Sequence, residues 1–93
     1  MAIVATYKQQ PADNLDYAFD YAEFLQSGDS VASGTISVSP SGLTVTGPVV
    51  SGKQLKYWVT GGISGVKYKV TVTMTTAVGR IKQDEAIFQI KDV

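Results

Sequence analysis

The chain has 93 residues, its eight basic and eight acidic side chains give a formal net charge of +0, and it contains neither histidine nor cysteine. A neutral chain lacks the excess positive charge with which proteins contact nucleic-acid phosphates, so we expect no nucleic-acid partner. Without His and Cys, the chain has no disulfides, none of the common zinc ligands, and no Ser-His or Cys-His nucleophile system. The length suits a single immunoglobulin-like domain over residues 1–93.

The N-terminal segment MAIVATYKQQ has no basic stretch and only a few apolar residues before Lys8. We therefore expect neither a signal peptide nor a membrane-spanning segment. The first seven residues, MAIVATY, leave two interpretations open. They form either a strand of the domain or an apolar arm that crosses to a neighbouring copy.

The next segment, LDYAFD, alternates apolar side chains with polar or small ones, which is typical of a half-buried strand. The segment DYAEFLQSG that follows predicts one short helical turn near residues 21–26. Asp20 is a suitable N-cap, and Glu23 three residues later completes a capping-box pattern.

The stretch VASGTISVSPSGLTVTGPVVSG predicts two or three short strands, separated by turns at Ser39-Pro40-Ser41-Gly42 and at Gly47-Pro48. Proline has no backbone N–H to donate to a neighbouring strand. Pro40 and Pro48 therefore belong to turns or to sheet edges.

The segment QLKYWVTGG predicts another strand, with Leu55, Tyr57 and Val59 facing the core. This register turns Lys56 and Trp58 outward. An exposed tryptophan is either packed beneath a lysine stem or is an anchor of a protein interface, where this residue type is strongly enriched. A shift of one residue would instead place Trp58 in the core.

The clearest strand is VKYKVTVTMT, in which apolar residues alternate with Lys and Thr. Its core-facing residues are Val66, Tyr68, Val70, Val72 and Met74. Tyr68, near the start of this strand, suits a tyrosine corner, in which the hydroxyl bonds back to the preceding loop.

Residues 77–80 predict a turn, because Gly79 tolerates positive φ. The last strand follows, from about Arg80 to Lys91. Ala86, Phe88 and Ile90 are expected to face inward, and Ile87, Gln89 and Lys91 outward. Asp84-Glu85 interrupts the apolar pattern, which indicates a bulge or an exposed edge.

Together these segments predict an all-β fold: an immunoglobulin-like antiparallel β-sandwich of about seven strands with one short helical turn near residues 21–26. An OB-like or other small barrel is the alternative.

No constellation of residues predicts catalysis or metal binding. Asp16, Asp20 and Glu23 match no calcium-loop spacing, and Asp84 and Glu85 are neighbours that a strand turns to opposite faces. The GGISG loop lacks the Lys-Ser/Thr pair and the helix of a phosphate-binding loop. We therefore expect no enzyme, no metal and no cofactor.

Charge is distributed unevenly, with acidic residues in the first third and most basic ones in the second half. This pattern is either two solvated faces or a head-to-tail contact between copies, which suits a ring. A patch of Trp58 with Ile87, and basic residues that meet an acidic face, are the candidate contacts. The candidate interface residues are Trp58, Lys67, Lys69, Arg80, Ile87, Asp16 and Asp20.

An ordered set of motifs resembles a family of small tailed-bacteriophage proteins, the fiber-tail adaptor proteins. The motifs are Lys8, Pro11-Ala12-Asp13, Leu15-Asp16-Tyr17, Phe19-Asp20, Leu25, Gly28-Asp29, Gly42-Leu43, Trp58-Val59-Thr60-Gly61-Gly62, Gly65, Tyr68, Thr76-Ala77-Val78-Gly79-Arg80 and Asp84-Glu85. They cover nearly the whole chain in order. The family pattern often has a tryptophan in the helical connector, where this chain has Tyr21 or Phe24.

The resemblance implies a non-enzymatic virion structural protein that joins the tail or neck to fibers or to neighbouring tail proteins, in a homo-oligomeric ring. It implies a place in the virion, after assembly in the host cytoplasm. A capsid-decorating (cement) protein and a carbohydrate-binding immunoglobulin-like module, with Trp58 and an exposed tyrosine as its platform, are the alternatives.

Overall fold

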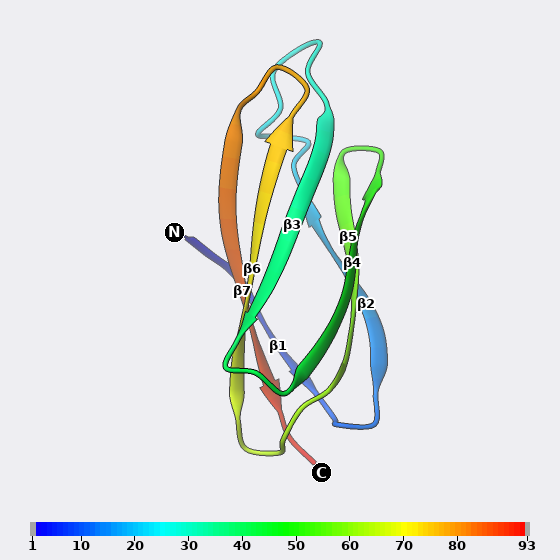
Figure 1. Ribbon diagram of the computed structural model, residues 1–93, viewed down its shortest axis with the longest axis vertical. Coiled ribbons are helices and arrows are strands. Elements are labelled where there is room, and N and C mark those ends of the chain that lie inside the picture. The colour runs from blue at the N-terminus through cyan, green and yellow to red at the C-terminus, as the bar shows by residue number, and fades with distance from the viewer. Residues whose placement is uncertain (1, 93) are drawn as a thin grey trace.

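The computed structural model describes residues 2–92 of the chain, and its side chains over residues 5–92. It is built from seven strands in two packed sheets (Figure 1). The strands are β1 (Ala2–Gln9), β2 (Asn14–Asp20), β3 (Val31–Ser39), β4 (Leu43–Ser51), β5 (Gln54–Gly61), β6 (Lys67–Thr76) and β7 (Ile81–Ile90). The predicted all-β sandwich is confirmed, and the alternative of a closed barrel is wrong.

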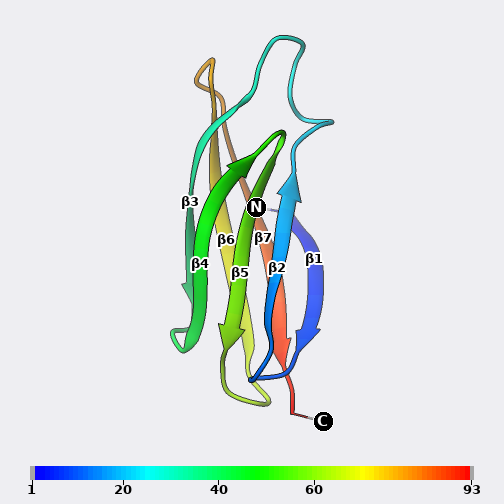
Figure 2. The ribbon, with the colours of Figure 1, turned by 90° about the vertical axis from the view of Figure 1, so that its right-hand side faces the viewer.

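The first sheet, sheet A, has the strand order β1-β7-β6-β3, and the second, sheet B, has the order β2-β5-β4 (Figure 2). These orders match the C-F-G and B-E-D pairings of immunoglobulin constant-type sandwiches. The pair β1–β7 is parallel, however, whereas all other pairs are antiparallel. The expectation of a fully antiparallel sandwich is therefore wrong for β1, which lies in the opposite sheet from β2 and runs alongside β7.

The predicted alternation places the core correctly. Leu55, Tyr57 and Val59 of β5 are at most 1% exposed, and they face the equally buried apolar side chains of β6 and β7. The two sheets thus bury one cluster between them. Its members are Phe19, Tyr21, Val31, Leu43, Leu55, Tyr57, Val59, Tyr68, Val70, Val72, Met74, Ala86, Phe88 and Ile90.

Strand β1 pairs with β7 in sheet A and is bonded to sheet B through the side chain of Gln9, which is buried although polar. Its Nε2 donates to the carbonyl of Val59 in sheet B at 2.8 Å, and its Oε1 accepts from the Tyr17 hydroxyl at 2.6 Å. The ring of Tyr7 in the same strand packs at a tilt against one ring of each sheet, with its centroid 4.6 Å from that of Tyr17 and 5.1 Å from that of Phe88. Residues 2–9 are therefore a strand of their own sandwich, and the interpretation as an exchanged arm is not supported.

The tyrosine corner predicted at Tyr68 is confirmed. Its hydroxyl accepts a hydrogen bond from the backbone N–H of Ile63 at 3.0 Å, five residues upstream. Gly62 beside it has a φ of +94°, and a Cβ there would lie 2.7 Å from Ile90 Cγ1. The corner thus packs the β5–β6 loop tightly against the last strand.

Replacing Tyr68 with phenylalanine is expected to lower the free energy of unfolding by about 1 kcal/mol, because the Ile63 N–H loses its partner. For a domain of this size the melting temperature falls by roughly 4–8 °C, which thermal melting followed by circular dichroism measures. Tyr21→Phe is the matched control, since the Tyr21 hydroxyl has no hydrogen-bond partner among the described residues. Equal melting temperatures for Tyr68→Phe and the native chain would contradict the prediction.

The helical turn expected near residues 21–26 is a single hydrogen-bonded turn rather than a helix. The N–H groups of Phe24 and Leu25 both bond to the carbonyl of Tyr21, and the next bond in the segment, from Asp29 N to the Gln26 carbonyl, closes a separate turn. Asp20 does cap this turn, through a 2.9 Å bond from Ala22 N to Oδ1. The turn stops there because a lone turn gains too few bonds to propagate, and Tyr21 is held in the core.

The sequence predicted that the acidic pair Asp84-Glu85 lies at an exposed edge or in a bulge, and neither description fits the structure completely. Strand β7 is central in sheet A, and both residues are buried, at 3% and 5% exposure, so the prediction of an exposed edge is wrong. A register shift does occur nearby, but it lies in β1, between Ile3 and Ala5. Asp84 pairs with Val72 and points into the sandwich, while Glu85 faces outward.

Candidate functional site

The candidate interface residues lie on three separate surfaces. Asp16, Asp20 and Trp58 lie on the outer face of sheet B, where β2 and β5 pair. Lys67, Lys69 and Ile87 lie on the outer face of sheet A. Arg80 lies at one end of the molecule, in the β6–β7 turn.

Trp58 occupies the middle of the outer face of sheet B and is 46% exposed, as its register predicted. Its direct neighbours across the sheet are Asp16 in β2 and Thr46 in β4. Lys56, on the same face, forms an ion pair of 3.4 Å with Asp16, and Val49 opposite Lys56 is 62% exposed. These five residues form a surface that we call the Trp58 face.

The Trp58 face has the composition of a small protein-binding surface. It has one large aromatic residue at its centre, an exposed valine beside it, and polar or charged side chains around both. Interface hot spots have this arrangement, with an aromatic anchor inside a polar rim. Val49 was not among the sequence candidates, because alternation across the Gly47-Pro48 interruption does not predict which way it faces.

The proposed patch of Trp58 with Ile87 is wrong. Both side chains point outward, but they belong to different sheets, so the full thickness of the sandwich separates them. Ile87 is half-buried between Thr6 and Lys69 of the neighbouring strands. It therefore adds nothing to the Trp58 face.

The basic residues of sheet A are only partly available to a partner. Lys69 Nζ lies 3.3 Å from Oε2 of Glu85, a side chain that is 7% exposed. Lys69 therefore balances a buried carboxylate within its own chain. Lys67 is exposed on the same face.

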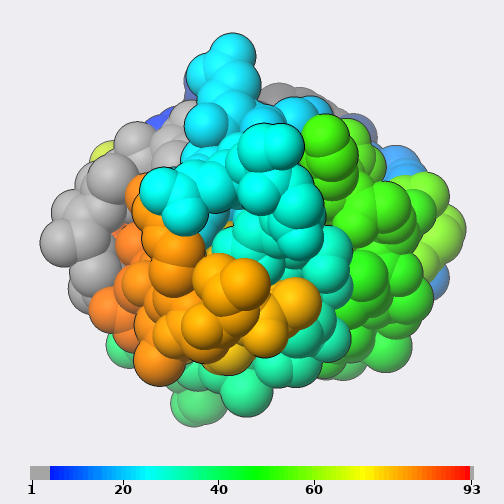
Figure 3. Space-filling view, turned by 90° about the horizontal axis from the view of Figure 1, so that it is seen from above, coloured from blue at the N-terminus to red at the C-terminus, as the bar shows by residue number. Residues whose placement is uncertain are grey.

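Residues 21–30 join β2 to β3, and we call this segment the connector. Arg80 binds to it. Its guanidinium lies 4.2 Å above the ring centroid of Phe24, and Nη1 donates to the Phe24 carbonyl at 3.3 Å. Figure 3 looks onto this end, where the connector (cyan) lies beside the β6–β7 turn (orange). Arg80 thus has a structural role that its sequence position does not reveal.

Asp29 joins the connector to the same turn from the other side. Its Oδ1 accepts from Ser30 N at 2.8 Å and from Val78 N at 3.3 Å. Desolvation opposes ionisation here, but hydrogen bonds from Ser30, Thr76 and Val78, together with the charge of Arg80, lower the pKa of Asp29 below its usual value. The carboxylate therefore stabilises the folded state above the usual aspartate pKa, and this contribution is lost as the pH falls through the lowered pKa.

This end also carries two of the most exposed apolar side chains, Val78 and Ile81, at 67% and 68%. Sequence reasoning missed both. Val78 lies in a turn, where alternation does not apply. Ile81 faces outward in β7. The alternation of Ala86, Phe88 and Ile90 predicts this direction when it is extended back to the start of the strand.

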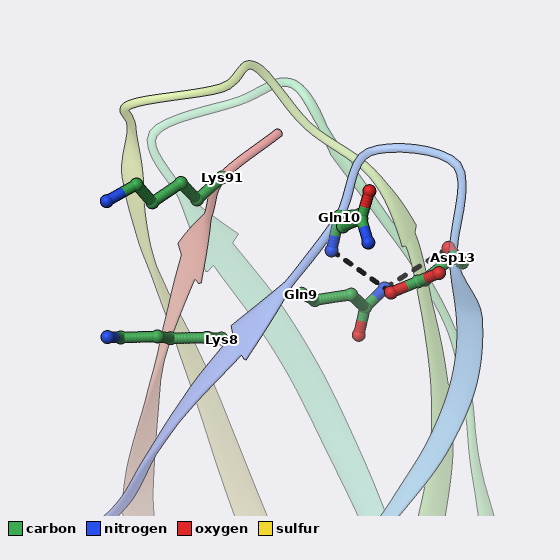
Figure 4. A pocket seen from close by; sticks show the side chains of 5 residues that line it. All are labelled: Lys8, Gln9, Gln10, Asp13 and Lys91. Atoms are coloured by element: carbon green, nitrogen blue, oxygen red, sulfur yellow. Dashed lines mark hydrogen bonds between the residues drawn. The ribbon is translucent and has the colours of Figure 1, made fainter. Parts of the chain in front are cut away.

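A shallow hollow of about 310 Å³ lies at the opposite end, lined by Lys8, Gln9, Gln10, Asp13 and Lys91 (Figure 4). Its polar groups serve the β1–β2 turn: Asp13 Oδ2 accepts from Gln10 N at 3.1 Å, and Gln9 Nε2 donates to the Asp13 carbonyl at 3.2 Å. The polar groups of the hollow are therefore engaged in the hydrogen bonds of the β1–β2 turn, and Lys8 and Lys91 lie at its rim.

Within the described part of the chain, no group of three or more His, Cys, Asp or Glu side chains is placed to hold a metal ion. Over the same residues, the structure has no helix that is long and apolar enough to cross a membrane. All five tyrosines are buried or half-buried, so none of them joins Trp58 in an exposed aromatic platform.

The fold defines the chain as a small all-β protein of two packed sheets, and its outer surface carries the Trp58 face. Comparison with known families makes this specific: the family model described as podophage GP4 fiber-tail adaptor protein gp77 matches residues 9–89. The chain belongs to this family, and it is a bacteriophage structural protein of the fiber-tail adaptor type. No curated protein matches the chain.

Proposed function

We propose that this protein is a non-enzymatic connector at the neck or tail of a podophage particle, joining the tail to fibers or to neighbouring tail proteins. The observation that carries the proposal is the family match over residues 9–89, which runs from the end of β1 into β7. An adaptor of this family binds other virion proteins and resides in the virion. Assembly takes place in the host cytoplasm.

The Trp58 face is the proposed contact with the partner protein. Burying a half-exposed indole removes a large apolar area from water, and the Asp16–Lys56 pair at 3.4 Å adds directional polar groups at the rim. Since Trp58 is on the central strand of sheet B, its position is fixed by hydrogen bonds on both sides. A rigid anchor of this kind loses little conformational entropy on binding.

A homo-oligomeric ring is the proposed arrangement of copies. Asp16 and Asp20 lie on the outer face of sheet B, whereas Lys67 and Lys69 lie on the outer face of sheet A. Asp16 and Lys69 are each paired within the chain, with Lys56 and Glu85. Asp20 and Lys67 therefore supply the opposite charges for a head-to-tail contact, which repeats around a closed ring. Arg80 is less suited to this contact than its charge suggested, because Phe24 and the connector already hold it.

Trp58→Ala is expected to reduce incorporation of the protein into particles at least tenfold, because a central aromatic anchor contributes about 2 kcal/mol or more to binding. Quantitative mass spectrometry of purified virions carrying the variant measures the copies per particle. Ile63→Ala is the matched control, since Ile63 is even more exposed than Trp58 (64% against 46%) but lies in the β5–β6 loop. Normal incorporation of Trp58→Ala, with an unchanged melting temperature, would contradict this interface.

The position in the virion is tested separately by gold-labelled antibody against the protein on purified particles. Label at the neck or tail is the expected result. Label over the head would support capsid decoration instead, and the connector proposal would then be wrong.

A further inference from the structure

The two sheets of the sandwich have four edge strands, β1 and β3 in sheet A and β2 and β4 in sheet B. An edge strand presents unpaired N–H and C=O groups on one side, and these can pair with a strand of another chain. Proteins commonly block such pairing with charged side chains, prolines or bulges. The four edges of this chain differ in how far they are blocked.

Three of the four edges carry such features. Strand β1 contains the charged residue Lys8 as well as a register shift between Ile3 and Ala5. Strand β2 has the charged residues Asp16 and Asp20. Strand β4 contains Gly47-Pro48, where proline has no N–H to donate and the pairing register shifts.

Strand β3 is the least blocked of the four edges. Its sequence, VASGTISVS, has neither a charge nor a proline, and after a register shift between Val31 and Ser33 it pairs regularly with β6 as far as Ser39. In Figure 1, β3 is drawn in front of β6, and among residues 2–92 no strand pairs with its other edge. Its outward side chains are exposed, and its inward Ile36 and Val38 are only half-buried. The edge is therefore long, uncharged and open.

We propose that β3 pairs antiparallel with β3 of a second copy of this chain. Each sheet A has four strands, so the pair would share one continuous sheet of eight. A two-fold contact sets a strand against itself, and like charges directly opposite each other are unfavourable. The same contact through β2 would oppose aspartates, whereas β3 has no charge to repel its copy and the whole chain is neutral.

The contact also extends the burial of side chains at the margin of the sandwich. Ile36 and Val38 face the core from the last strand of sheet A, and an added strand continues the sheet beyond them. The pairing uses an edge and leaves both outer faces free, including the Trp58 face. It goes beyond the proposed function, and it can fail or hold independently of where the protein sits in the particle.

The first test uses charge at the middle of β3, where Thr35 is exposed. Analytical ultracentrifugation of the purified native chain is expected to show a concentration-dependent dimer. Thr35→Lys and Thr35→Glu are each expected to raise its dissociation constant by about fivefold or more, because like charges meet across the two-fold axis. An equimolar mixture of the two variants is expected to restore dimerisation.

Thr44→Lys and Thr44→Glu are the matched controls, because Thr44 is an equally exposed outward residue on β4, the blocked edge. These variants are expected to dimerise like the native chain. A native chain that stays monomeric up to millimolar concentration would overturn the proposal. So would a dimer that Thr35→Lys and Thr35→Glu leave unchanged.

A second test fixes the partner strand directly. The chain has no cysteine, so Thr35→Cys introduces a single thiol. Residues opposite each other in an antiparallel pair have Cα atoms within the range that a disulfide spans. Mild oxidation is expected to yield a covalent dimer for Thr35→Cys or for the adjacent outward position Ser37→Cys, and not for Thr44→Cys. Cross-linking of Thr44→Cys alone would place the contact on another edge and overturn the proposal.

Discussion

Replacing Lys82 with methionine is expected to lower the free energy of unfolding by about 2–3 kcal/mol at neutral pH. The Lys82 ammonium lies 3.2 Å from Oδ1 of Asp84, whose side chain is only 4% exposed. Without the ammonium, Asp84 becomes a buried carboxylate with no opposite charge beside it, which is costly. The expected loss lies below the range of about 3–5 kcal/mol for fully buried pairs because Lys82 itself is 34% exposed.

Methionine is chosen because it keeps most of the side-chain stem. Lys82 Nζ lies 5.3 Å from the ring centroid of Phe24, and a thioether also packs favourably near an aromatic ring. Urea denaturation measures the loss, and the double variant Lys82→Met/Asp84→Asn is expected to recover much of it, since both charges are then gone. Lys56→Met is the control, because its partner Asp16 is 44% exposed and such pairs contribute at most about 1 kcal/mol. Equal losses for Lys82→Met and Lys56→Met would show that the buried pair has no special cost.

The inward direction of Asp84 also shows where sequence reasoning stops. Alternation along β7 correctly places Ala86, Phe88 and Ile90 in the core, and the same alternation extended backwards puts Asp84 on that face too. The charge argued against this extension, so the sequence indicated an edge or a bulge. Asp84 can face the core because it forms an ion pair with Lys82, two residues away in the same strand, whose side chain is partly exposed.

Register predicts whether a side chain faces in or out, but not on which sheet it lies. Trp58 and Ile87 were both correctly assigned outward positions, and the error was to place them together. Strand pairing decides this, and β5 and β7 join different sheets through contacts between residues far apart in the sequence. The parallel pairing of β1 with β7 is likewise set by long-range contacts such as the Gln9 bridge to Val59, which no local pattern contains.

Local features were predictable because their physics is local. Asp20 caps the turn that follows it, and the Tyr68 hydroxyl reaches a backbone N–H five residues upstream. Arg80 was predictable only in part. Its position in a turn follows from the local sequence, but its packing on Phe24 joins residues 56 positions apart. The Trp58 face is similar, since its centre could be predicted from β5 alone, whereas Asp16, Thr46 and Val49 become its neighbours only through strand pairing.

Raising the pH above 10 is expected to destabilise the fold through two buried tyrosines. Tyr21 and Tyr57 are 2% and 1% exposed. Burial raises the pKa of both hydroxyls well above the usual value, and the nearby charge of Asp84 raises that of Tyr21 further. The folded chain therefore retains protons that the unfolded chain releases. The stability from these protons is complete below the ordinary tyrosine pKa of about 10 and is lost as the pH rises toward the raised pKa.

Each tyrosine that stays protonated in the fold costs about 1.4 kcal/mol for every pH unit above 10, so the pair costs about 3 kcal/mol at pH 11. Urea midpoints between pH 8 and pH 11 measure the decline. Lysines also lose protons in this range, so the informative quantity is the difference between the native chain and Tyr21→Phe/Tyr57→Phe. The double variant is expected to lose stability less steeply, and Tyr21→Phe alone to give an intermediate slope. Because the Tyr21 hydroxyl has no hydrogen-bond partner among residues 2–92, its removal is expected to cost little at pH 7. Parallel curves for all three proteins above pH 10 would mean that neither hydroxyl is protected from ionisation by the core.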